Sequence, residues 1–189
     1  MKQFFFSIIL TFLIITSSLA NETITSIENN WNQIKSMSGE FEQVDSEGKL
    51  SRGQFFFLKP YHSKFQYQDR NEDIITNKSL MLVVDKEGFK IESYAIGNNI
   101  LKKLLSDNLN INNEFDIISF LKKNEFYEMI LKIKKNKSYN QIKLSFDKVT
   151  LNLKKWEISD EFDNKTVFKF TKIKKNIFIS QNLFVVKYN

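Results

Sequence analysis

Alternation of apolar and polar residues, repeated along most of the chain, restricts it to folds built around a β-sheet. Successive side chains of a strand point to opposite faces, so a period of two predicts a strand with one buried face. Roughly ten or eleven short segments between residues 40 and 186 have this period, and turns containing Gly48 and Gly88 separate some of them. The sequence therefore predicts one large, strongly curved antiparallel sheet.

Three segments instead have the spacing of helices, with apolar residues at steps of three and four. The first is predicted over residues 22–37, because the glycine at position 39 is typical of the end of a helix. Two shorter helices are predicted within residues 100–123, around Leu104 and around Ile118. Helices embedded among strands usually cover one face of a sheet. The predicted fold class is α+β, mainly β, with the helices gathered on one side.

The strand predicted over residues 50–59 carries three consecutive phenylalanines, in the sequence RGQFFFLKP. Because successive side chains face opposite sides, Phe55 and Phe57 share one face with Lys59, and the residues between them share the other. We assign Phe55 and Phe57 to the concave side of the sheet, under the helices. Two interpretations remain open for them: permanent core, or the lining of a cavity.

The first twenty residues have the features of a cleavable signal peptide. Lys2 precedes an apolar run from Phe4 to Ile15, and Ser18-Leu19-Ala20 has small residues at the two positions that a signal peptidase reads. The run is shorter than the roughly 20 apolar residues of a membrane span, although an uncleaved anchor is the alternative. We therefore predict an exported chain whose mature part, residues 21–189, forms one domain.

Few residues offer catalytic or metal-binding chemistry. The chain has no cysteine and one histidine, His62, and its five glycines are too dispersed for a phosphate-binding loop. The formal net charge is +6, but the lysines are spread along the alternating segments rather than clustered. These features argue against an enzyme, a metal site, a cofactor and a nucleic-acid partner. A binding function is what the sequence favours.

Residues 39–67, GEFEQVDSEGKLSRGQFFFLKPYHSKFQY, contain a run of motifs. These are a Phe-x-Gln after the first helix, a Gly-x-Phe-x-Phe-x-basic-Pro segment and an alternating Phe-x-Tyr. In order and spacing they resemble the LolA family of periplasmic lipoprotein carriers. The matching positions are Phe41, Gln43, Gly53, Phe55, Phe57, Lys59, Pro60, Phe65 and Tyr67. The resemblance continues through Ile74 to Asn77, Leu80 to Asp85, Leu104-Leu105 and Leu153 to Asp160.

The resemblance implies an unclosed antiparallel β-barrel with about three helices as a lid on its concave side. A hydrophobic cavity between sheet and lid would hold acyl chains. The side chains assigned to the cavity are Phe41, Phe55, Phe57, Phe65, Tyr67, Leu82 and Val84. The side chains assigned to the lid are Ile27, Trp31, Ile34, Leu101, Leu104, Leu105, Phe115 and Ile118.

Lys59 departs from the family pattern, which usually has an arginine before this proline. In the family, that arginine hydrogen-bonds to the lid backbone and holds the ligand-free form closed. A guanidinium is a planar group with five donors, whereas a lysine amine is a mobile point charge. We therefore predict that Lys59 is a weakened latch, bonded to carbonyl groups near Leu101 to Leu105. The alternative is that its amine only reaches the solvent at the cavity rim.

The same resemblance implies a monomeric periplasmic carrier that moves acylated lipoproteins from the inner to the outer membrane. Its implied partner at the inner membrane is an ABC-type release complex, and an outer-membrane receptor is a further partner that remains open. The family's receptor counterpart is acylated on a cysteine, which this chain lacks, so a carrier is favoured. Two alternatives remain: a periplasmic regulator that senses lipids or lipoproteins, and a carrier of another lipid.

Overall fold

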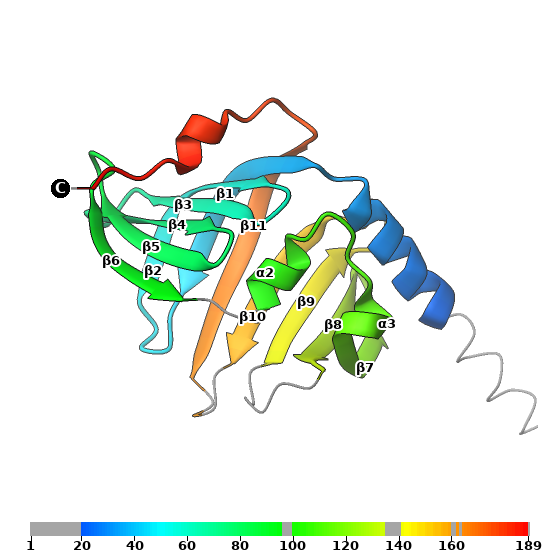
Figure 1. Cartoon of the computed structure of the whole chain (residues 1–189). Helices are drawn as coiled ribbons and strands as arrows, with labels where there is room; N and C mark the ends of the chain where they lie inside the picture. Colours follow the sequence, from blue (N-terminus) through cyan, green and yellow to red (C-terminus); the bar gives the residue numbers. More distant parts are fainter. Residues whose placement is uncertain (1–19, 96–99, 135–140, 160–161, 163, 189) are drawn as a thin grey trace, which may run out of the picture.

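A single sheet of eleven strands dominates the computed structural model, which describes residues 20–95, 100–134, 141–159, 162 and 164–188 (Figure 1). Neighbouring strands are antiparallel, in the order β6-β5-β4-β3-β2-β1-β11-β10-β9-β8-β7. In the described residues the edge strands β6 and β7 do not pair with each other, so the sheet curves into a barrel that does not close. The predicted fold class is confirmed. The strands are β1 (Ser36–Val44), β2 (Leu50–Leu58), β3 (His62–Tyr67), β4 (Glu72–Asn77), β5 (Leu80–Asp85), β6 (Lys90–Ala95), β7 (Phe115–Lys122), β8 (Phe126–Ile133), β9 (Gln141–Asp147), β10 (Leu153–Ser159) and β11 (Lys165–Lys175).

Three helical segments pack against the concave face of this sheet. They are residues 20–32, α2 (Ile100–Leu104) and α3 (Ile111–Glu114), and their apolar side chains share one core with the sheet. We call these three segments, with the turns that join them, the lid. A 3₁₀-helix, η1 (Gln181–Phe184), packs on the opposite, convex face (Figure 1). Of the predicted signal peptide, all but Ala20 lies outside the described residues.

The first helix ends at residue 32, earlier than predicted, because a distant side chain bonds the groups that another turn would use. The amide of Lys35 donates to Oδ1 of Asn176 at 2.8 Å, and Nδ2 of Asn176 donates to the carbonyl of Gln33 at 3.2 Å. Helix ends need such partners, since the last carbonyls have none within the helix. The residue after Lys35 already begins β1.

The helix predicted around Ile118 is wrong, because this segment forms the edge strand β7. The pairing of β7 with β8 shifts between Ile117 and Ser119, so Ile118 is the extra residue of a bulge. An inserted residue breaks the two-residue period and leaves a spacing that mimics a helix. Phe115 is buried in the core from the sheet, whereas Ile118 is 54% exposed, so neither belongs to a lid helix.

The two faces of the sheet carry separate apolar cores. The cross-strand register places Phe65, Ile74 and Val83 on the concave face. Leu82 and Val84 therefore lie on the convex face, in a smaller cluster covered by η1. Their prediction as cavity residues is wrong, because the run LMLVVD is apolar on both faces and alternation alone does not say which face is concave.

Gly53 of the motif is required by the packing of the neighbouring strands. It pairs with Phe41 on one side and Tyr67 on the other. A Cβ at this position would lie 2.0 Å from the carbonyl oxygen of Gln66 and 2.9 Å from the ring of Phe41. Only a residue without a side chain lets the Phe41 ring and the backbone of Gln66 approach this position so closely.

Candidate functional site

Aromatic side chains from β1, β2, β3, β10 and β11 form a cluster at the centre of the concave face. Neighbouring rings have centroids 4.9 to 6.3 Å apart, and Phe57 stacks on Trp156. Such edge-to-face and offset contacts are the favourable geometries of aromatic pairs. The members of this aromatic cluster are Phe41, Phe55, Phe57, Phe65, Tyr67, Trp156, Phe168 and Phe170. It contains the five aromatic residues that the sequence assigned to the cavity.

Two polar groups lie within the aromatic cluster. The hydroxyl of Tyr67 donates to Oε1 of Gln43, and burial raises the pKa of Tyr67 to about 12, so the phenol stays neutral. The indole nitrogen of Trp156 has no hydrogen-bond partner within the described part of the chain. The cluster is otherwise a buried, apolar interior.

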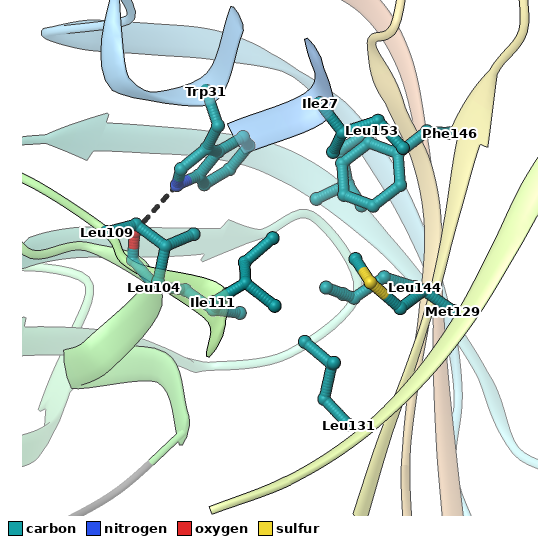
Figure 2. A pocket seen from close by; sticks show the side chains of 10 residues that line it. All are labelled: Ile27, Trp31, Leu104, Leu109, Ile111, Met129, Leu131, Leu144, Phe146 and Leu153. Atoms are coloured by element: carbon teal, nitrogen blue, oxygen red, sulfur yellow. Dashed lines mark hydrogen bonds between the residues drawn. The ribbon is translucent and has the colours of Figure 1, made fainter. Parts of the chain in front are cut away.

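A wholly apolar pocket lies beside the aromatic cluster, between the lid and strands β8, β9 and β10 (Figure 2). Its free volume is about 10 Å³, which is barely the space of one water molecule. Figure 2 shows the lid side chains of Ile27, Trp31, Leu104, Leu109 and Ile111 pointing toward side chains of the sheet. The sheet contributes Met129, Leu131, Leu144, Phe146 and Leu153. In this closed form the pocket has no room for an acyl chain.

The pocket lining agrees with the predicted lid better than with the predicted cavity. Ile27, Trp31 and Leu104 were predicted for the lid and line the pocket, while none of the seven described residues predicted for the cavity does. Of the remaining lid residues, Ile34 and Leu105 are buried in the same core, and Leu101 packs against it. The pocket residues of β8–β10 were missed as site residues, although their alternation identified their strands.

Lys59 bonds the lid, but at a different carbonyl from the one predicted. Its amine donates to the carbonyl oxygen of Trp31 at 2.8 Å and lies 5.1 Å from the centre of the Trp31 ring. The Trp31 indole in turn donates to the carbonyl of Leu104 at 2.7 Å. The carbonyl of Leu105 accepts from the amide of Tyr61 instead. The end of β2, the first helix and α2 are thus connected by one chain of hydrogen bonds.

The environment of Lys59 disfavours its charge. Burial, and to a smaller extent the nearby charge of Lys35, lower the pKa of Lys59 from its usual 10.5 to about 8, while Asp107 acts in the opposite direction. The bond to the Trp31 carbonyl and the contact with the indole face offset part of this cost. Lys59 therefore makes two opposing contributions to the stability of the closed lid: its bonds to Trp31 stabilise it, and the burial of its charge destabilises it.

Polar side chains of the first helix hold the rest of the lid together. Asn32 makes two bonds of 2.8 Å with the backbone of Leu109, donating to its carbonyl and accepting from its amide. Glu28 accepts from the amide of Ile111 at 2.6 Å. The helical segments are therefore bonded to one another as one lid, and its apolar side chains supply most of its contact with the sheet.

The site offers binding and no evident reaction chemistry. His62 lies outside the pocket, with Nδ1 2.7 Å from the carbonyl of Pro60. Within the described residues no group of three His, Cys, Asp or Glu side chains is placed to hold a metal ion. An apolar pocket without charged or reactive groups suits an apolar ligand.

The family model described as "Outer membrane lipoprotein carrier protein LolA" matches residues 32–187. The chain belongs to the LolA family. Proteins of the LolA family are carriers or binding proteins located in the periplasm. In the described part of this LolA-family chain, no helix combines the length and the hydrophobicity needed to cross a membrane.

A relative in Rickettsia prowazekii (strain Madrid E), described as an uncharacterized protein, is 26% identical over 193 residues. That match covers 99% of this chain and 88% of the relative. The two proteins are therefore alike along nearly their whole length.

Solved structures share the fold of this LolA-family chain at low sequence identity. A putative outer membrane lipoprotein-sorting protein domain from Vibrio parahaemolyticus is 10% identical with a TM-score of 0.50, covering 87% of this chain and 94% of that one. A chain of the Pseudomonas aeruginosa MucA/MucB complex is 10% identical with a TM-score of 0.51. It aligns with 89% of this chain, which spans only 61% of that chain's length. At these identities the likeness establishes the fold alone.

Proposed function

We propose that this protein carries acylated lipoproteins through the periplasm by holding their acyl chains between the lid and the sheet. The observation that carries the proposal is the wholly apolar pocket under a lid attached to the sheet mainly by side-chain packing. Because the closed pocket has about 10 Å³ of free volume, loading requires the lid to move away from β8–β10. The expected ligand-binding surface is then the pocket lining together with the adjoining aromatic cluster.

The energetics of lipids explain why such a carrier is needed. Transfer of one CH₂ group out of water is worth about 0.8 kcal/mol, so a chain of about fifteen carbons gains roughly 12 kcal/mol. A free lipoprotein would therefore cross water extremely slowly. The carrier replaces the membrane interior with a second apolar environment. It releases its ligand only if the free energy of the acyl chain is nearly equal in the carrier and in the membrane. Closure of the lid over the empty pocket favours release, because the apolar surface of lid and sheet is buried again when the ligand leaves.

The route that we propose follows the family. Residues 1–20 act as a cleaved signal peptide, and the mature monomer receives lipoproteins from an inner-membrane ABC-type complex and delivers them to the outer membrane, to a receptor if one is present. Catalysis, metals and cofactors have no part in this proposal. Lys59 acts as a weak latch on the first helix, with a lysine in place of the arginine that is usual in the family.

The decisive experiment uses inner-membrane vesicles that contain a labelled lipoprotein. With ATP and the exported protein, we expect a soluble one-to-one complex of carrier and lipoprotein. Release without formation of that complex would contradict the proposal. Copurification with free phospholipid alone would favour a carrier of another lipid.

A matched pair of variants tests where the acyl chains bind. Leu144→Phe and Leu82→Phe add the same volume at buried positions on opposite faces of the sheet, and each is expected to cost about 1–3 kcal/mol of stability. Only Leu144→Phe adds that volume to the pocket, so only this variant should load less lipoprotein. An equal loss in both variants would place the binding surface elsewhere.

A further inference from the structure

Phe178 is the most exposed large apolar side chain within the described residues, with 93% of its surface accessible. It lies in the connection between β11 and η1, which passes from the end of the sheet onto its convex face (Figure 1). Its neighbours Ile177 and Ile179 are half-buried, and Ile179 packs against the convex cluster. The chain therefore buries apolar side chains on both sides of Phe178 and leaves Phe178 in water.

The connection that carries Phe178 is held in place by hydrogen bonds to the start of β1. The amide of Asn176 donates to the carbonyl of Ser36 at 2.8 Å, and the hydroxyl of Ser36 donates to the carbonyl of Ile177. The Asn176 side chain also bonds the backbone of Gln33 and Lys35, at the end of the first helix. Phe178 is thus presented by a fixed backbone, next to the lid.

Three lysines lie on segments that adjoin Phe178. Lys174 and Lys175 precede it on β11, and the amide of Lys35 is bonded to the same connection. In the described structure none of these three lysines forms an ion pair, whereas Lys172 binds the nearby carboxylate of Glu40 at 2.8 Å. An exposed apolar ring on a segment that adjoins unpaired lysines suits the boundary between acyl chains and anionic headgroups.

We propose that residues 174–178, together with Lys35, form a docking site for an anionic lipid membrane. Phe178 inserts at the level of the headgroups, and Lys35, Lys174 and Lys175 contact lipid phosphates. A protein partner fits less well, because a stable protein interface covers about 800 Å² on each side and the described residues exposed next to Phe178 are polar. The site goes beyond the carrying of acyl chains, since it would bring the end of the lid helix to the membrane surface.

Vesicle binding of the exported protein tests this proposal. We expect binding to phosphatidylcholine vesicles with about 30% phosphatidylglycerol, weakened by salt and by removal of the anionic lipid. Phe178→Ser should weaken binding about tenfold, and Lys174→Gln about fivefold. Val149→Ser is the matched control, because Val149 is 91% exposed in the turn between β9 and β10. A loss in the control as large as that of Phe178→Ser would overturn the proposal.

A second variant locates the inserted residue directly. Trp31 and Trp156 are buried and are present in both proteins, so the difference in emission between Phe178→Trp and the unmodified protein reports on position 178. We expect its emission to shift to shorter wavelength and to be quenched by brominated lipids when anionic vesicles are added. Unchanged emission from the vesicle-bound protein would refute insertion. Absence of vesicle binding, with self-association that Phe178→Ser abolishes, would overturn the proposal and assign the surface to contact between copies of the chain.

Discussion

Replacement of Lys59 by leucine tests how strong the latch is. The substitution keeps an apolar side chain against Trp31 and removes the charged bond of 2.8 Å to the Trp31 carbonyl. Loss of a hydrogen bond from a charged donor costs about 1.5–3 kcal/mol, and loss of the contact with the indole face costs about 0.5–1 kcal/mol. Both losses destabilise the closed lid.

The same substitution also removes a cost. The fall in the pKa of Lys59 from 10.5 to about 8 corresponds to roughly 3 kcal/mol for a fully buried group. Lys59 is half-exposed, so solvent screening reduces this to about 1–2 kcal/mol. The difference leaves the closed lid less stable by about 1 kcal/mol, which is about a fivefold larger open population.

Hydrogen exchange of the lid helix measures this population, and the rate of lipoprotein loading provides a second reading. We expect Lys59→Leu to raise both about fivefold at pH 7, whereas Lys59→Arg should lower both, because a guanidinium adds donors and is more easily desolvated. If Lys59→Leu exchanged and loaded at the same rates as the unmodified protein, the latch would be refuted. A hundredfold increase in either rate would refute the argument that the cost of burying the Lys59 charge offsets much of the gain from its bonds.

The remaining predictions concern pH and two pairs of substitutions. An open lid returns the pKa of Lys59 toward 10.5, so between pH 8 and 10.5 the open form binds more protons than the closed form. Raising the pH through this range should therefore favour the closed lid, and hydrogen exchange of the lid helix, corrected for intrinsic rates, should fall. Lys59→Leu should abolish this pH dependence. Gly53→Ala should lower the free energy of unfolding by more than about 3 kcal/mol, because its Cβ would lie 2.0 Å from a backbone oxygen, whereas Gly48→Ala, in open space at positive φ, should cost about 1 kcal/mol. Trp156→Phe should cost about 1–2 kcal/mol less than Trp31→Phe, because only the Trp31 indole has a described hydrogen-bond partner. Denaturant titrations measure both pairs, and equal costs within a pair would contradict the corresponding assignment.

The sheet could be predicted from the sequence because its strands have one strongly apolar face. Phe55 and Phe57 are both buried on the concave side, as the two-residue period of a strand and the family motif indicated. Alternation fails where both faces are apolar, as in β5, because the face that becomes concave then depends on what packs against the sheet, and the convex face of β5 is covered by η1, which is remote in sequence. It also fails at the β7 bulge, where one inserted residue, Ile118, imitates the spacing of a helix.

The position of the pocket could not be predicted, for a related reason. Resemblance to the family drew attention to the aromatic residues of β1–β3, yet the pocket lies against β8–β10. Which part of a concave face remains loosely filled depends on how the lid crosses it. That crossing is fixed by bonds such as those of Asn32 with Leu109 and Asn30 with Leu151, which join residues far apart in the sequence.

Where the lid separates from the sheet follows from the kinds of contact on each side of the pocket. The concave aromatic cluster is built on hydrogen-bonded strands, so separating its rings requires breaking the β-sheet itself. The lid crosses the same core with few bonds to the sheet and its turns, chiefly those made by Lys59, Tyr61, Asn30 and, at the end of β8, Lys134. Its internal bonds, including those of Asn32, do not change when it moves as a unit. Exposed apolar surface is then the main cost of opening, and an acyl chain that covers this surface removes that cost.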